Sequence, residues 1–156
     1  RQRQMCIETV IEESLRRNAK SILPSRLASL SKQCGLPYSS VKINSSQGRW
    51  GSCSARKDIN LSYYLVLLPS HLIDYVLLHE LCHTREMNHS ERFWVLLNQF
   101  TEGKALALRG ELRKYRTEFR ILYCQDSAIV LAHLCQHAGT VVTMRWHGCA
   151  NMVAQT

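Results

Sequence analysis

The stretch that decides the fold is His79-Glu80-Leu81-Cys82-His83, and a third histidine, His89, follows after a short interval. Residues four apart share a face of a helix, so His79 and His83 can direct two imidazoles towards one metal ion. Glu80 lies beside the first of them. This spacing predicts a metal site carried by a helix.

The chemistry of zinc accounts for the residue types. A catalytic zinc ion takes about three protein ligands and leaves a further position for water or substrate. His79 and His83 supply two ligands, and His89 is the natural third. Zinc lowers the pKa of its bound water towards about 7, and a neighbouring carboxylate can accept the proton. We therefore expect Zn2+ as the cofactor and Glu80 as the general base.

The third ligand has alternatives. Glu86 or Glu91 would replace His89 in a site that uses a carboxylate. The interval from His83 to His89 equals that of the metzincins, whose pattern also needs a glycine three residues after the second histidine. This chain has Glu86 at that position, which argues against membership of that group.

Composition limits the class of protein. The 156 residues carry a formal net charge of +8. Basic and acidic groups number seven and three over residues 1–36, six and five over 37–100, and seven and four over 101–156. The basic flanks make anionic partners such as nucleotides or nucleic acid plausible. The seven cysteines form no C-x-x-C pair, and the sequence shows no signal-peptide pattern. No apolar run approaches the ~18 residues that a membrane span requires. These features favour a cytoplasmic protein without a membrane partner.

The N-terminal third is expected to be helical. Residues 3–20 place apolar side chains at helical spacing, with charged side chains largely on the other face. Pro24 suits the first turn of a second helix, which Gly35 would close. We therefore predict two helices in this region.

Two short strands are expected next. Residues 39–44 and 58–63 alternate apolar and polar side chains, which is typical of strands in a small sheet. The stretch Arg49-Trp50-Gly51-Ser52-Cys53 lies between them and is interpreted as a loop.

A buried helix should carry the histidines. From Pro69 onward the positions are apolar on nearly every side, which predicts a central helix inside the fold. Residues 84–88 must break it so that His89 can return to the metal. Asn88 tolerates a left-handed turn conformation, and Asn88 or Ser90 can cap the following helix. A further basic helix is expected over 104–119.

The combined motifs resemble the YgjP-like metallopeptidase-domain family. The matching segments cover roughly residues 25–116, and together they are more specific than the histidine motif alone. They are Arg49-Trp50-Gly51-Ser52-Cys53-Ser54, Ile59-Asn60-Leu61, Ile73-Asp74-Tyr75-Val76, His79 to His83, Asn88-His89-Ser90 and Phe93-Trp94.

The resemblance implies an α+β fold, with a zincin-like helical core packed on a small sheet. It also implies His79, His83 and His89 as zinc ligands and Glu80 as the catalytic acid/base. We expect a metallohydrolase domain over residues 1–119 and a C-terminal extension over 120–156, for which no fold is predicted. The β-rich segment that normally opens the family has no counterpart in these residues.

Three functions compete. The first is a zinc-dependent metallopeptidase whose extended substrate pairs with a strand edge such as 58–63. The second, implied by an assignment within the family, is a pyrophosphatase acting on UTP. In that case Arg49 and Arg92, with Arg56 and Lys57, would hold phosphates, and Trp50 would stack on the base. The third is a DNA-associated module without enzymatic activity, favoured by the basic flanks.

Overall fold

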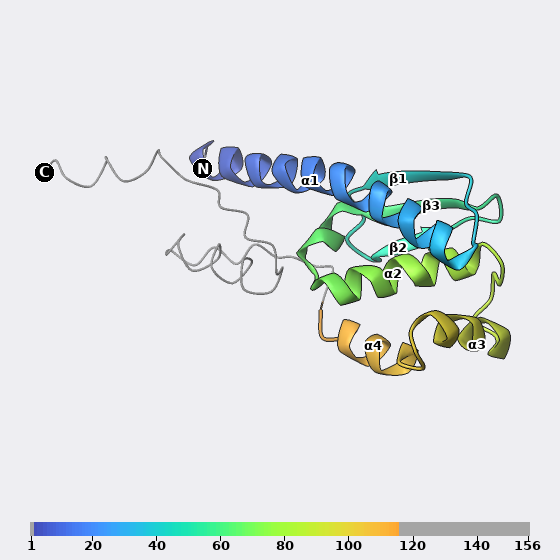
Figure 1. Cartoon of the computed structure of the whole chain (residues 1–156). Coiled ribbons are helices and arrows are strands. Elements are labelled where there is room, and N and C mark those ends of the chain that lie inside the picture. Colours follow the sequence, from blue (N-terminus) through green and yellow to red (C-terminus); the bar gives the residue numbers. More distant parts are fainter. Residues whose placement is uncertain (1, 116–156) are drawn as a thin grey trace, which may run out of the picture.

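The computed structural model describes residues 2–115, and their side chains from residue 9 onward except that of residue 11. Its elements combine helices with a small sheet, which confirms the expected α+β class (Figure 1). In chain order they are α1 (Gln2–Cys34), β1 (Ser40–Asn44), β2 (Gly51–Cys53), β3 (Asp58–Ser62), the 3-10 helix η1 (Tyr63–Leu67), α2 (Ser70–His83), α3 (Glu91–Phe100) and α4 (Ala105–Leu112).

Helix α1 is continuous, so the predicted division into two helices at Pro24 is wrong. Ala19, Leu23 and Leu27 recur every four residues, and all three are 0% exposed. A proline inside a helix costs about 3 kcal/mol. Burying each leucine contributes about 1.5–3 kcal/mol. The apolar face continues on both sides of Pro24, and its burial outweighs the missing backbone hydrogen bond.

The sheet has three strands where two were expected. β3 is the central strand, parallel to β1 on one side and antiparallel to β2 on the other. Ile59 and Leu61 of β3 are fully buried, as their alternation predicts. The stretch interpreted as a loop contains β2, in which Gly51 lies opposite Leu61 and Cys53 opposite Ile59. A strand of three residues is too short for alternation to identify it.

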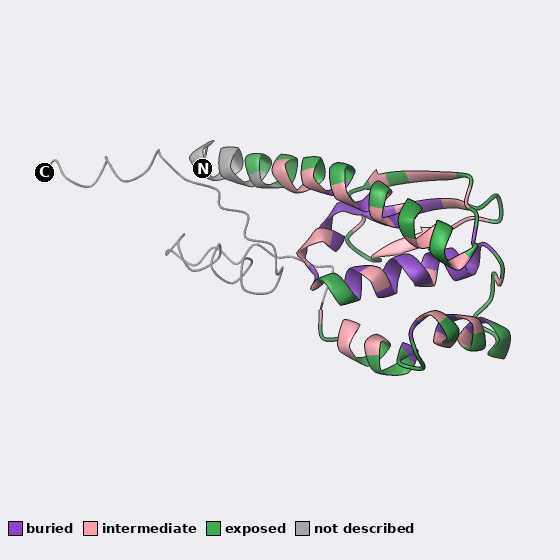
Figure 2. Cartoon of the chain, viewed as in Figure 1, coloured by how far each residue is buried: buried purple, intermediate pink, exposed green. Residues whose placement is uncertain are grey.

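Helix α2 is the centre of the fold, as predicted. It lies between the sheet and the pair α3 and α4, and most of its length is buried (Figure 2). Asp74 joins it to α1 by accepting two hydrogen bonds from the Arg26 guanidinium, one of them 2.8 Å long. At its C-terminal end, the Thr84 hydroxyl donates to the carbonyl of Leu81 at 2.7 Å.

Helix α2 ends at His83, as expected. Asn88 does not adopt the left-handed conformation that it tolerates, because the non-glycine residues with positive φ in the described part are Lys57 and Glu102. Ser90 occupies the N-cap position of α3, but its side chain makes no capping hydrogen bond. The loop between α2 and α3 therefore uses neither a left-handed Asn88 nor a capping hydrogen bond from the Ser90 side chain.

The C-terminal predictions are covered only in part. Helix α4 falls within the expected helix 104–119, after Gly103 at a φ of 75°. The remainder of that helix beyond residue 115, and the extension 120–156, lie outside the described residues. Between residues 2 and 115, no helix has both the length and the apolar character that crossing a membrane requires.

The continuity of α1 can be tested at Pro24. In a helix interior alanine is favoured over proline by about 3 kcal/mol, so Pro24→Ala should raise the free energy of unfolding by about 1–3 kcal/mol. The matched control, Ala28→Pro, should lower it by about 3 kcal/mol or more, because it removes a helical hydrogen bond. Urea unfolding measures both. A loss of stability in Pro24→Ala would contradict a helix that runs through this position.

Candidate active site

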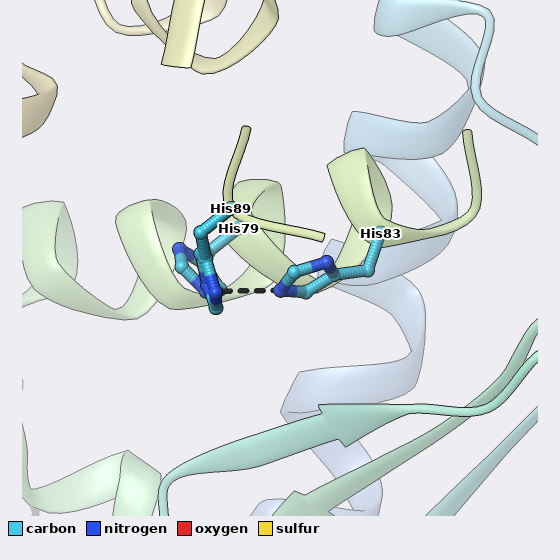
Figure 3. Close-up of side chains that lie close together, drawn as sticks. All are labelled: His79, His83 and His89. Carbon is cyan, nitrogen blue, oxygen red and sulfur yellow. Dashed lines mark hydrogen bonds between the residues drawn. The ribbon is translucent and has the colours of Figure 1, made fainter. Parts of the chain in front are cut away.

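Three imidazoles meet at one point. His79 and His83 lie one turn apart in the last part of α2, and His89 reaches them from the loop before α3 (Figure 3). The Nε2 atom of His79 lies 3.2 Å from that of His83 and 3.0 Å from that of His89. The structure therefore brings together all three predicted ligands, and His89 rather than Glu86 or Glu91 completes the group.

The donor set fits a metal ion. One nitrogen from each ring lies within 4.8 Å of the others. Two nitrogens bound to one tetrahedral zinc ion at its usual bond lengths are about 3.3 Å apart, close to the observed separations. Burial is the main cause that lowers the pKa of His79, to about 3, and that of His83. Both rings are therefore neutral at pH 7, which is the form that binds metal.

Phe93 of α3 supports the three rings. Its side chain is 0% exposed, and its ring centroid lies 4.6 to 4.9 Å from the centroids of all three histidines. The Nδ1 atom of His83 lies 3.0 Å from the carbonyl of Glu86, a contact that fixes the ring orientation. The Nδ1 atom of His79 is buried and has no hydrogen-bond partner in the described part of the chain.

Glu80 lies against β2 at very close range. Its carboxyl is buried, with 6% of the residue exposed. A Cβ atom added at Gly51 would lie 2.8 Å from both Cγ and Oε1 of Glu80. Only glycine leaves room for this approach. Burial raises the pKa of Glu80 to about 8, while the positive charge of Arg49 acts in the opposite direction.

An open cleft of about 390 Å³ adjoins the histidines. Its lining residues come from helix α2, from the segment at the start of β2, from His89 and from helix α4 with the residues just after it. Arg49 and Trp50 line the cleft, as proposed from the sequence. Arg92 is exposed on α3 and is absent from the lining, as are Arg56 and Lys57 in the turn between β2 and β3.

Sequence reasoning missed several lining residues. These are Tyr75 and Val76 of α2, and Arg109, Leu112, Arg113 and Tyr115 in or just after α4. The two arginines are four residues apart, which places them on one face of a helix. That spacing was visible in the sequence, but nothing local indicated that the face adjoins the metal site.

Comparison with known proteins agrees with this geometry. The model of the YgjP-like metallopeptidase domain matches residues 1–115. The chain belongs to the YgjP-like family. Its match begins earlier than the roughly 25–116 inferred from the motifs, so α1 is part of the family domain.

Among solved structures, the YgjP-like chain resembles the crystal structure of the metallopeptidase zymogen of Pyrococcus abyssi abylysin. The TM-score is 0.54 at 20% sequence identity, and the match covers 60% of this chain and 93% of that one. At this identity the likeness supports the fold alone. No curated protein matches the sequence.

The approach of Gly51 to Glu80 gives a direct test. Gly51→Ala should displace the carboxyl, because its Cβ would overlap Cγ and Oε1 of Glu80, and overpacking of this kind costs about 1–3 kcal/mol. Urea unfolding gives the stability, and a crystal structure of the variant gives the position of Glu80. Gly48→Ala is the matched control, since nothing lies within 4 Å of its added Cβ. Equal stability of the two variants, with Glu80 unmoved, would contradict the tight contact.

Proposed function

We propose that this chain is a zinc-dependent peptidase in which Glu80 is the general base. The observation that carries the proposal is the convergence of His79, His83 and His89 at the edge of a cleft that Glu80 also lines. Membership of a metallopeptidase-domain family supports the same reaction class.

Zinc is the metal that this donor set suits best among those common in hydrolases. Three neutral imidazoles on a compact site leave a position for water or substrate, as catalytic zinc sites do. Structural zinc sites are instead closed by four protein ligands. In the described part of the chain, the group contains only these three histidines. The donor set therefore favours a catalytic site.

Glu80 has the position and the environment of a general base. A bound zinc ion supplies Lewis acidity, which polarises the scissile carbonyl and lowers the pKa of water. Glu80 follows the ligand His79 and opens onto the cleft, so it can hold the proton removed from water and return it to the leaving amine. Burial raises the pKa of Glu80 to about 8 and so favours its protonated form, whereas the positive charge of Arg49, and that of a bound zinc ion, would favour the ionised form that proton acceptance requires.

The sheet offers one strand edge beside the site. β3 is paired on both sides, so the proposed substrate pairing along 58–63 does not fit the structure. In the described part of the chain, β2 pairs with β3 on one side only and is the last strand of the sheet. Trp50 and Gly51 line the cleft at the start of this strand. An extended peptide that adds to the free edge of β2 would run beside Glu80.

Nucleotide hydrolysis is a second candidate. The observation that favours it is the lining of the cleft by Arg49, Arg109 and Arg113 together with Trp50, because guanidinium groups bind phosphate oxygens and an indole stacks on bases. Under this reading UTP would be hydrolysed at the same metal site.

The metal assignment predicts which histidines matter. Purified protein loaded with zinc and dialysed should hold one ion per chain, measured by mass spectrometry of the metal. His79→Ala, His83→Ala and His89→Ala should each lower the affinity at least about 10-fold, because a ligand is lost. His71→Ala is the matched control, since its exposed ring pairs with Glu111 at 2.8 Å. Full retention of zinc by the three variants would refute the site.

The role of Glu80 predicts a loss of turnover without a loss of metal. Loss of a general base lowers turnover about 100- to 10,000-fold, so Glu80→Gln should do so while zinc content stays unchanged. Denatured protein substrates and UTP are assayed side by side, and the substrate whose turnover disappears defines the reaction class. Glu86→Gln is the control, because its side chain is outside the histidine group. Undiminished turnover in Glu80→Gln would remove Glu80 as the base.

A further inference from the structure

The cleft beside the histidines has a strong excess of positive charge. Arg49, Arg109 and Arg113 line it, and Glu80 is the one acidic side chain among the described lining residues. The arginines come from two separate parts of the chain. Arg49 precedes β2, whereas Arg109 lies within α4 and Arg113 caps it.

The described side chains give these arginines no carboxylate partner. Among the side chains of residues 9, 10 and 12–115, none of the three arginines forms an ion pair. Glu111, the acidic residue of α4, pairs with His71 instead, with Nε2 and Oε1 2.8 Å apart. As far as the described side chains are concerned, the guanidinium donors in the cleft are therefore available to a ligand.

Arg109 is held in place by an aromatic contact. Its guanidinium carbon lies 5.1 Å from the ring centroid of Trp94, a cation–π arrangement. An arginine restrained in this way loses less conformational freedom when it binds an anion.

The cleft walls strengthen the attraction. Val76, Leu112 and the rings of Tyr75 and Tyr115 also line the cleft, so the charges lie beside apolar surface. Positive charge beside low-dielectric walls concentrates the field and draws anions into a cleft. Arginine suits carboxylates, which it binds through two parallel hydrogen bonds.

We propose that Arg109 and Arg113 determine specificity by binding a carboxylate of the peptide substrate close to the scissile bond. The proposal rests on the peptidase function proposed above and adds a substrate class to it. The carboxylate is either an Asp or Glu side chain or the free C-terminus of the peptide, since both present the same group. The free edge of β2 beside the cleft favours a peptide over a nucleotide as the carrier of that group.

Matched peptides test the proposal on the zinc-loaded chain. One series differs only by Glu, Gln or Lys at the positions flanking the cleaved bond, and a second pairs a free C-terminus with its amide. Arg109→Gln combined with Arg113→Gln is compared with wild type by kcat/KM. Arg92→Gln is the control, because Arg92 is an exposed arginine outside the cleft.

The expected result is a preference for one carboxylate-bearing series. Charged hydrogen bonds of this kind correspond to about a 10- to 100-fold effect, so the wild type should favour the acidic peptide by that factor. The double variant should lose the preference because its kcat/KM for the acidic peptide falls towards its kcat/KM for the neutral peptide, and Arg92→Gln should keep the preference. Arg109→Glu should move the preference towards the Lys peptide.

Two results would overturn the proposal. They differ in whether they also refute the peptidase function. Equal cleavage of acidic and neutral peptides by the wild type would refute the carboxylate subsite and leave the peptidase function intact. Hydrolysis of UTP with no cleavage of any peptide would refute both, and would assign the arginines to phosphate. Circular dichroism and zinc content identify a variant that fails to fold. Such a variant is replaced by Arg109→Lys combined with Arg113→Lys. This double variant keeps the positive charge and removes the paired donors of the guanidinium groups.

Discussion

The arrangement of the site depends on the burial of α2. The helix lies between the sheet on one side and α3 and α4 on the other, and its apolar residues form the centre of the core. A helix packed on several faces has little freedom to rotate or shift. The backbone positions of His79, Glu80 and His83 are therefore set by the apolar packing of α2. Local contacts then orient their side chains, such as the contact of His83 with the Glu86 carbonyl and that of Phe93 with the imidazoles.

A single close contact then couples that helix to the sheet. Gly51 lets β2 approach Glu80 until no side chain fits between them. The same contact removes the carboxyl from water, which raises its pKa, and it places the free strand edge next to the carboxyl. The position of Glu80 and the position of the strand edge are thus one structural feature. Phe93 has the corresponding role on the other side, where one buried ring packs against all three imidazoles.

The sequence predicted the parts of the site whose information is local. His79 and His83 share a face because of helical geometry alone, and α2 reads as buried because its residues are apolar on nearly every side. Two predictions, the helix start at Pro24 and the loop over residues 49–53, are wrong for the same reason: tertiary packing and pairing, and not local sequence, decide the structure at these places. Pro24 indicated a helix start by local preference, but the long apolar face of α1 outweighed it. β2 has three residues and no alternation, so only its pairing with β3 makes it a strand.

The remaining missed residues lie far from the histidines in sequence but close to them in the fold. They account for the positive charge of the cleft. Counted by sequence, the region around the histidines is nearly neutral, with six basic and five acidic groups over residues 37–100. The fold changes this balance locally, because α4 brings Arg109 and Arg113 to the cleft while its Glu111 turns to His71. Of the acidic residues of the middle region, Glu80 alone lines the cleft in the described part of the chain, and Asp74 is paired with Arg26. Net charge along the chain therefore does not describe the field at the site. The packing of α4 on α2 determines that field, because it decides which charged residues line the cleft beside the three histidines.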